Sequence, residues 1–255
     1  MNTNPLFITA NWNAPKHVKT LITTRIGGVS TGNYNSFNLA MDIGDNSQLV
    51  LQNRQILNSH LPHHPYWLKQ IHSNQVIHLE QPGITAEIIP EADASITLLP
   101  QNVCVVMTGD CLPILLTDIM GSFVAAVHAG WKGLYKEIIV KTLKLSQTNP
   151  QNILAYIGPS ICQKHYEVNE ELFKLFTNLD KENAHFFIDK PHKKFDCNLT
   201  GIAKLQLIQH GVLEPNIFMS NECTYCNEEL FYSYRRNNIT GRFASCIWLS
   251  DRHIL

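Results

Sequence analysis

Short runs of apolar and β-branched residues recur through the first two thirds of the chain and predict strands. Such runs, bounded by Gly, Pro, Asn and Asp, are typical of β-structure. Residues 123–127 are apolar at every position, which indicates a strand buried on both faces. The strands predicted in this way span residues 18–24, 66–69, 75–79, 95–98, 103–107, 114–117, 123–127 and 153–157.

Other segments carry apolar residues at helical spacing. Asn46 and Asn169 are suited to cap the helices that follow them, because their side chains can accept a hydrogen bond from the first helical turn. Gly211 is well placed to end the last of these helices. The predicted helices span residues 47–59, 133–145, a segment after Asn169, and the segment containing Leu199, Ile202, Leu205 and Ile208.

The order of these elements predicts the fold class. Strands and helices interleave, and several neighbouring strands are joined by short turns, so we expect a layered α/β or α+β fold with mixed β-sheets. Residues 230–249 are predicted to form a hairpin around the turn at 237–241. With no internal repeat and no linker-like stretch, residues 1–255 are interpreted as a single domain.

Charge and hydropathy exclude several classes of protein. The 255 residues include 20 Lys and Arg against 21 Asp and Glu, and no basic stripe that would indicate nucleic-acid binding. There is no apolar run of about 18 residues, so no membrane span is expected. The N-terminal segment lacks the basic start and apolar core of a signal peptide, which predicts a cytoplasmic protein.

Three strand-like runs end in residues with chemical potential. These are His72, Cys111 with Asp110 before it, and His128. Two imidazoles and a thiolate suit a zinc ion that keeps its fourth position open. The separations of 39 and 17 residues match no local zinc motif, so a buried thiol with two ordinary histidines remains an alternative. In a second alternative no metal is bound, and Cys111 is a nucleophile with His128 or His72 as its base and Asp110 nearby.

Other charged residues and histidines in the chain suggest further roles. Arg25 and Lys132 could bind an anion, since a guanidinium fork and a helix start both suit phosphate. Asp93 opens a predicted strand and is expected to support a ligand histidine. We expect Arg235 and Arg236 to be solvated on the hairpin, and a group of three histidines to lie on the surface. That group is His60, His63 and His64.

The chain has seven cysteines, an odd number that favours reduced thiols or metal ligands over a disulfide framework. Cys223 and Cys226 form a Cys-x-x-Cys pair. Because no second pair lies at the spacing of a zinc ribbon, they are interpreted as plain thiols rather than as a zinc or redox site.

An ordered set of motifs extends from Thr23 to Leu249. The motifs are Thr23-Thr-Arg-Ile-Gly-Gly28, Ser36-Phe-Asn-Leu39, Trp67-Leu-Lys-Gln-Ile-His72, Ala92-Asp93-Ala94, Asp110-Cys-Leu-Pro113, Val127-His-Ala-Gly-Trp-Lys-Gly133, Ile157-Gly-Pro159, Tyr166-Glu-Val168, Tyr234-Arg-Arg236 and Thr240-Gly-Arg242. In these motifs the chain resembles the YfiH family, whose members are described as laccase-like multicopper polyphenol oxidases and as purine nucleoside phosphorylases.

The resemblance implies a fold, a cofactor and an activity. The family's zinc ligands fall on His72, Cys111 and His128, and its fold is a layered α/β/β/α domain. The implied reactions are phosphorolysis of adenosine, inosine and 5′-methylthioadenosine, and adenosine deamination. Zinc activates water at neutral pH, which suits deamination, and Asp110 or Asp93 would then act as acid and base. Phosphorolysis needs an anion cradle, for which Arg25 and Lys132 are the candidates.

Other functions are also compatible with these residues. A Cys-His hydrolase or amidase that edits peptidoglycan precursors would use Cys111 without a metal, and a non-catalytic metal- or nucleotide-binding domain would use the same residues. Copper could occupy the same ligands, so a polyphenol oxidase side activity is compatible with the sequence. We expect a monomer whose partners are purine nucleosides and phosphate, with neither nucleic acid nor membrane bound.

Overall fold

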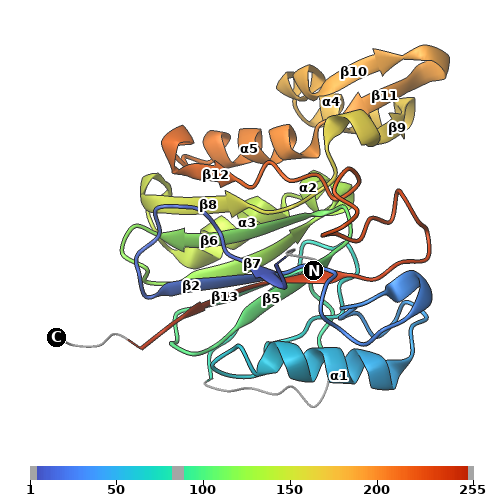
Figure 1. The fold of residues 1–255 in the computed structure, drawn as a ribbon. Helices are drawn as coiled ribbons and strands as arrows, with labels where there is room; N and C mark the ends of the chain where they lie inside the picture. The colour runs from blue at the N-terminus through green and yellow to red at the C-terminus, as the bar shows by residue number, and fades with distance from the viewer. Residues whose placement is uncertain (1–4, 82–88, 252–255) are drawn as a thin grey trace.

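A mixed six-stranded sheet lies at the centre of the computed structural model, which describes residues 5–81 and 89–251 (Figure 1). Its strand order is β12-β8-β6-β7-β4-β3, with parallel pairs at its two edges and antiparallel pairs between them. The strands are β3 (Val76–His78), β4 (Ala94–Thr97), β6 (Leu112–Asp118), β7 (Val124–Ala129), β8 (Ile153–Ile157) and β12 (Ile217–Met219).

A second sheet packs on one face of the central sheet. It is antiparallel, in the order β1-β2-β13-β5. Ile22 and Val106 from this sheet share an apolar core with Leu115 and Ala126 from the central one, which seals the two sheets together. The strands are β1 (Phe7–Ile8), β2 (Val18–Thr23), β5 (Cys104–Thr108) and β13 (Phe243–Leu249).

Helices cover the two outer faces of this pair of sheets. The helix α1 (Ser47–Asn58) packs on the outer face of the four-stranded sheet, where Leu57 meets Leu21. On the far face of the central sheet lie α2 (Trp131–Tyr135), α3 (Ile138–Ser146) and α5 (Leu199–Gln209). The result is the predicted α/β/β/α layering (Figure 1).

A small outlying layer completes the fold. The antiparallel strands β9 (Glu167–Asn169), β10 (Phe187–Lys190) and β11 (Lys194–Cys197) lie with α4 (Glu170–Leu179) at one end of the molecule (Figure 1). Short 3₁₀ helices connect the elements, at Gly32–Tyr34, Pro150–Asn152, Gln163–His165, Lys181–Phe186, Pro191–Lys193 and Glu214–Asn216.

The predicted caps form. The side chain of Asn46 accepts a hydrogen bond from Gln48 N, and that of Asn169 accepts one from Leu172 N. Gly211, with φ of +91°, follows α5 in the left-handed conformation that glycine adopts without strain. Within the described ranges no helix is long and apolar enough to cross a bilayer.

Three predictions of secondary structure are wrong. The predicted strand at residues 66–69 is absent, and only Tyr66 and Lys69 form isolated bridges. The helix predicted over 133–145 is divided into α2 and α3, because Glu137 has φ of +60° and cannot continue a right-handed helix. Residues 230–249 form no hairpin: only β13 is a strand, and it lies between β2 and β5, which are distant in sequence.

The hairpin fails because the residues before β13 are used elsewhere. Phe231 and Tyr232 are completely buried in the core between the two sheets, so residues 230–242 follow an irregular path instead of pairing with β13. The sheet of β9, β10 and β11 and the short edge strands β1 and β12 were not predicted, because their apolar runs are too short to stand out.

Candidate metal centre

Sheet register brings one end of β7 together with the starts of β4 and β6. In the antiparallel pair of β6 and β7, Leu112 is opposite Ala129, so Cys111 lies beside the end of β7. In the pair of β4 and β7, Ala94 is opposite Val127, so Asp93 lies beside His128, and His128 N donates to the Asp93 carbonyl at 2.7 Å. Residues distant in sequence are therefore placed together by strand pairing.

His72 comes from the turn at residues 71–73, which Asp93 holds in place. One carboxylate oxygen of Asp93 accepts from His72 N at 3.0 Å, and the other accepts from both the backbone N and the hydroxyl of Ser73, at 2.6 and 2.7 Å. His72 itself has φ of +56°. These bonds stabilise a backbone conformation that turns the imidazole of His72 toward Cys111.

The ligand atoms of His72, Cys111 and His128 lie within 4.8 Å of one another. Cys111 Sγ is 3.9 Å from His72 Nε2, and the ring centroids of His72 and His128 are 4.8 Å apart. His128 Nδ1 bonds the buried Asp93 carboxylate at 2.8 Å, which leaves Nε2 to face the other two ligands. His128 is buried whereas His72 is exposed, so the cluster opens to solvent on one side.

Gly130 allows this close approach. A Cβ atom at this position would lie 2.8 Å from Cys111 Sγ and 3.1 Å from a ring carbon of His72. Any larger side chain would therefore displace the ligands.

The site stabilises a thiolate. Burial acts to raise the pKa of Cys111, but the charge and hydrogen bond of His128, together with His72, outweigh it and lower that pKa from about 9 to about 6. Burial acts to lower the pKa of His128, but Cys111 and Asp93 outweigh it and raise it to about 9. Burial acts to raise the pKa of Asp93, but the hydrogen bonds from His128 and Ser73 outweigh it and hold that pKa below its ordinary value.

The donor set fits a metal ion. Two imidazole nitrogens and one sulfur, in a cluster that opens to solvent on one side, match a catalytic zinc site with three protein ligands. The same set also suits copper, whose affinity for such ligands exceeds that of zinc.

Asp110 sits next to this centre but is fully engaged. Its two oxygens accept from Thr224 Oγ1 and from Arg235 N, both at 2.7 Å, so it anchors the segment 224–235. Burial raises the pKa of Asp110 in spite of these bonds. Asp93 is also engaged on both oxygens, and its contacts are with the protein rather than with an open surface.

The two predicted anion-binding residues come from different segments of the chain. Lys132 is exposed in the first turn of α2, two residues after Gly130, with its ammonium group 5.5 Å from the Trp131 ring. Arg25 donates three hydrogen bonds to the carbonyls of Asn35 and Glu228, at 2.8–3.0 Å, and lies over Tyr232. Part of its guanidinium is thus used to hold surrounding loops together.

Arg235 and Arg236 are not simply solvated, contrary to the prediction. Arg235 donates to the carbonyl of Glu167 at 2.9 Å, and Arg236 donates to the carbonyls of Thr224 and Tyr225 at 2.7 and 2.9 Å. Irregular loops leave carbonyls without strand partners, and these guanidinium groups satisfy them. His60, His63 and His64 are exposed, as predicted.

Two further residues near the centre were not selected from the sequence. Arg242 is half-buried, and its charge interacts favourably with Cys111 and Asp110, although burial lowers its pKa. Burial and the charge of Cys111 raise the pKa of Tyr166. Both residues belong to the motifs quoted above, so their position in those motifs was the available signal.

The comparisons with known proteins agree with this fold. The family model described as multi-copper polyphenol oxidoreductase laccase matches residues 19–250, and the chain belongs to this family. It is 43% identical to a protein of Haemophilus influenzae named purine nucleoside phosphorylase, over 94% of this chain and 98% of that one. It is 40% identical to the Escherichia coli protein named purine nucleoside phosphorylase YfiH, over 95% and 98% of the two chains.

A solved structure shows the same fold. The crystal structure of Neisseria meningitidis protein NMB0706 superimposes with a TM-score of 0.92 at 40% identity, and covers 97% of this chain and 100% of that one. The layered architecture derived above is therefore that of the YfiH-type proteins.

Proposed function

We propose that this chain is a purine nucleoside phosphorylase that acts at the centre formed by His72, Cys111 and His128. The observation that carries the proposal is the gathering of these three ligand atoms within 4.8 Å at a solvent-facing edge of the central sheet. The names of the relatives from Haemophilus influenzae and Escherichia coli supply the reaction class.

The reaction places clear demands on the site. A phosphate oxygen bonds to C1′ of the ribose while the bond from C1′ to the purine nitrogen breaks. The purine leaves with the bonding electrons and takes up a proton, and ribose 1-phosphate is the other product. The site must therefore bind an anion beside the sugar and stabilise charge that develops during bond cleavage.

Residues of this chain can meet these demands. His72, Cys111 and His128 would hold a zinc ion, which supplies Lewis-acid stabilisation of charge when bound. Asp93 keeps His128 in the orientation that presents Nε2. Lys132 and Arg25 would bind phosphate, and Arg242 is a third cation close to Cys111.

The substrates follow from the same proposal. Adenosine, inosine and 5′-methylthioadenosine are the expected nucleosides, and adenosine deamination is the expected second activity. Deamination releases ammonia and needs no phosphate, so the two activities are separable in one assay. Ammonia release from adenosine in phosphate-free buffer tests the second activity alone.

The first experiment measures release of hypoxanthine and adenine from inosine and adenosine with and without phosphate, and zinc content on the same sample. We expect phosphate-dependent release, at least a 100-fold loss in Cys111→Ala, and near-normal activity in Cys197→Ala. Cys197 is a buried thiol outside the centre and controls for loss of a cysteine. Full phosphorolysis by Cys111→Ala would show that the metal centre is not the active site.

The phosphate site is tested by kinetics. Arg25→Ala and Lys132→Ala are each expected to raise the KM for phosphate more than the KM for the nucleoside, because they remove positive charge from the anion site. Arg242→Ala provides a comparison, since the charge of this residue interacts with that of Cys111. Equal changes in both KM values for Arg25→Ala would exclude it from the phosphate cradle.

A Cys-His amidase is the second candidate, favoured by two observations. Cys111 Sγ lies 3.9 Å from His72 Nε2, and Asp93 orients His128 as a carboxylate orients the base in nucleophilic enzymes. Metal-free protein that cleaves peptidoglycan-type amides, and loses that activity when zinc is added, would support this function. A copper-loaded sample that oxidises phenols would indicate a side activity of the same ligands.

A further inference from the structure

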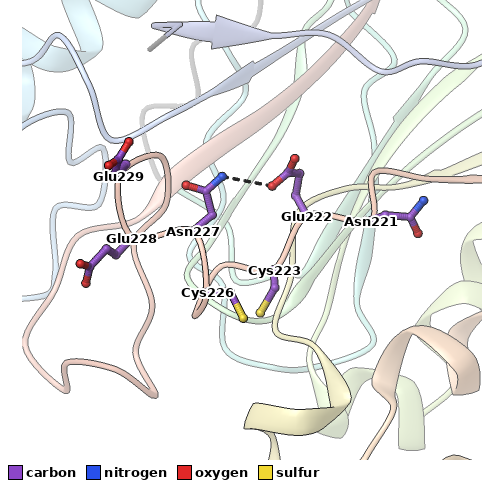
Figure 2. Close-up of a pocket in the computed structure, with 7 residues that line it drawn as sticks. All are labelled: Asn221, Glu222, Cys223, Cys226, Asn227, Glu228 and Glu229. Carbon is purple, nitrogen blue, oxygen red and sulfur yellow. Dashed lines mark hydrogen bonds between the residues drawn. The ribbon is translucent and has the colours of Figure 1, made fainter. Parts of the chain in front are cut away.

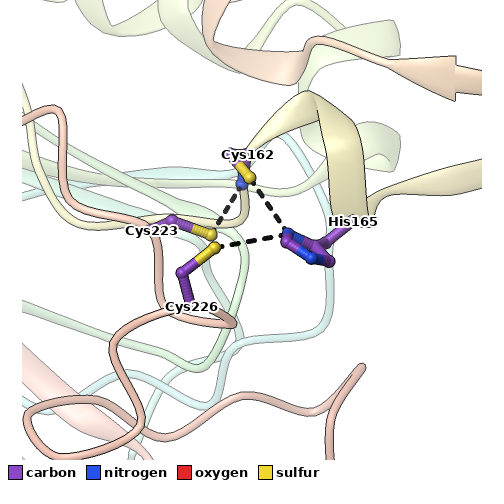
Figure 3. Close-up of side chains that lie close together, drawn as sticks. All are labelled: Cys162, His165, Cys223 and Cys226. Carbon is purple, nitrogen blue, oxygen red and sulfur yellow. Dashed lines mark hydrogen bonds between the residues drawn. The ribbon is translucent and has the colours of Figure 1, made fainter.

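A second cluster of metal-ligating side chains lies outside the centre described above. Cys162 and His165 face Cys223 and Cys226, although the two pairs are about 60 residues apart in sequence (Figure 3). His165 Nδ1 lies 3.3 Å from Cys162 Sγ and 3.4 Å from Cys226 Sγ. The four ligand atoms are all within 4.8 Å of one another.

Backbone hydrogen bonds hold the two pairs in register. Ser160 and Cys223 form a parallel bridge, and Cys162 N donates to Cys223 Sγ at 3.3 Å. Within the first pair, His165 N bonds the carbonyl of Cys162 at 3.1 Å, so the single turn of helix places the two side chains together. Within the second, Asn227 N bonds the carbonyl of Cys223 at 2.9 Å, which closes the turn that carries Cys226.

We propose that Cys162, His165, Cys223 and Cys226 form a structural zinc site. Three sulfurs and one imidazole nitrogen make the Cys3His set of closed zinc sites, and both pairs have the two-residue spacing that such sites use. In a tetrahedral zinc site neighbouring sulfur and nitrogen atoms stand about 3.6 Å apart, close to the two distances seen here. Four protein ligands leave no open position, so the ion would hold structure.

Neighbouring side chains orient the four candidate ligands without adding another one. The ring of His165 stacks on Tyr225 with centroids 4.2 Å apart, which fixes its orientation. Cys223 and Cys226 also line a surface hollow, but their sulfur atoms point away from the carboxylates on its other walls (Figure 2). Glu222, for example, accepts a hydrogen bond from Asn227 at 3.1 Å.

The site would clamp two segments that border the first centre. Thr224, next to Cys223, donates to Asp110 at 2.7 Å, and Asp110 precedes Cys111. From the other segment, Ile161 N bonds the carbonyl of Asp110 at 3.0 Å. Zinc bound at the Cys3His site would thus hold the two segments that fix Asp110 against each other.

The test counts zinc in the full-length protein purified under reducing conditions. We expect two zinc ions per chain in the wild type, one in Cys111→Ala, and none in Cys111→Ala combined with Cys223→Ser and Cys226→Ser. The double variant Cys223→Ser/Cys226→Ser alone should keep one ion and lose several degrees of Tm. His165→Ala should also lose an ion, whereas His185→Ala, which changes an exposed histidine, should not.

The result separates this proposal from the one about the first centre. One zinc per chain that disappears in Cys111→Ala and stays in Cys223→Ser/Cys226→Ser would overturn the Cys3His site and leave the first centre intact. Zinc that survives Cys111→Ala but is lost with Cys223 and Cys226 would support the Cys3His site and count against the first. A disulfide between Cys223 and Cys226 that forms even in the presence of excess zinc would also overturn it.

Wild-type protein provides a test that does not depend on folded variants. Alkylation followed by peptide mass spectrometry should leave Cys162, Cys223 and Cys226 unmodified while zinc is bound, and label them together after a chelator removes it. A separate spectroscopic test uses the Cys111→Ala variant loaded with Co²⁺ alone, in which thiolate-to-cobalt absorption should appear and be lost when zinc is added. Labelling of the three cysteines that is unchanged by the chelator would contradict the proposal.

Discussion

Asp93 is completely buried, and both of its carboxylate oxygens accept hydrogen bonds. One orients the imidazole of His128, and both hold the turn that presents His72. A carboxylate in this place favours the charged or metal-bound form of the neighbouring imidazole. Two of the three candidate ligands of the first centre therefore depend on a residue that is not itself one of the candidate ligands.

Replacing Asp93 tests this dependence. Asp93→Asn keeps the size of the side chain but removes its charge and puts an N–H group where an acceptor is needed. We expect zinc affinity to fall about 10- to 100-fold. A competition titration against a chromophoric chelator measures it, with the exposed Asp189→Asn as the matched control. Equal affinity in both variants would show that Asp93 does not position the ligands.

The pKa of Cys111 gives a second prediction at this scale. In metal-free protein its alkylation rate should reach half its maximum near pH 6, since the thiolate is the reactive form and persists above its pKa. His128→Gln removes the positive charge that outweighs burial, so the midpoint should move up by at least one pH unit. Mass spectrometry of the Cys111 peptide measures the rate. A midpoint near 9 in the wild type would contradict the prediction.

The elements around the first centre meet at their ends. His128 lies near the end of β7, Gly130 caps the start of α2, and Cys111 immediately precedes β6. The strands fix the backbone, and the candidate ligands lie at the strand ends or in the irregular residues beside them. Such an edge combines a rigid support with access to solvent.

A methyl group at position 130 should disturb this edge. In Gly130→Ala the new Cβ would lie 2.8 Å from Cys111 Sγ, so the sulfur or α2 must move, and zinc affinity should fall at least tenfold. Gly133→Ala, in the same helix, meets its nearest atoms at 3.4 Å and should bind zinc normally. Titration of both purified proteins with zinc makes the comparison. Normal binding by Gly130→Ala would mean that the site tolerates the displacement.

At the scale of the whole molecule, the packed layers contain the buried apolar core. Leu115 is completely buried where the central sheet packs on the four-stranded sheet. The second cluster lies at the periphery of these layers and joins the loop after β8 to the loop after β12.

Removing a side chain between the sheets should therefore weaken the entire fold. Leu115→Ala is expected to cost about 2–5 kcal/mol of unfolding free energy, through lost apolar burial and the cavity left behind. Leu51→Ala, at a side chain that is 50% exposed on α1, should cost less than about 1 kcal/mol. Urea unfolding followed by tryptophan fluorescence measures both. Similar losses in the two variants would argue against a shared core between the sheets.

The local pattern determined much of the fold by itself. The caps at Asn46 and Asn169, the buried strand β7 and the end of α5 were predicted, because each depends on residues within one or two turns of one another. The candidates His72, Cys111 and His128 were also found, since each follows a recognisable strand and belongs to a motif of the family.

Tertiary structure decided which segments distant in sequence contact each other. The pairing of β13 with β2 and β5, and the break at Glu137, depend on packing that no local pattern encodes. Cys223 and Cys226 look like plain thiols in sequence, and only the fold brings Cys162 and His165 to them. Sequence records which side chains are available, but their distances follow from strand register and loop path, which the packing of the layers sets.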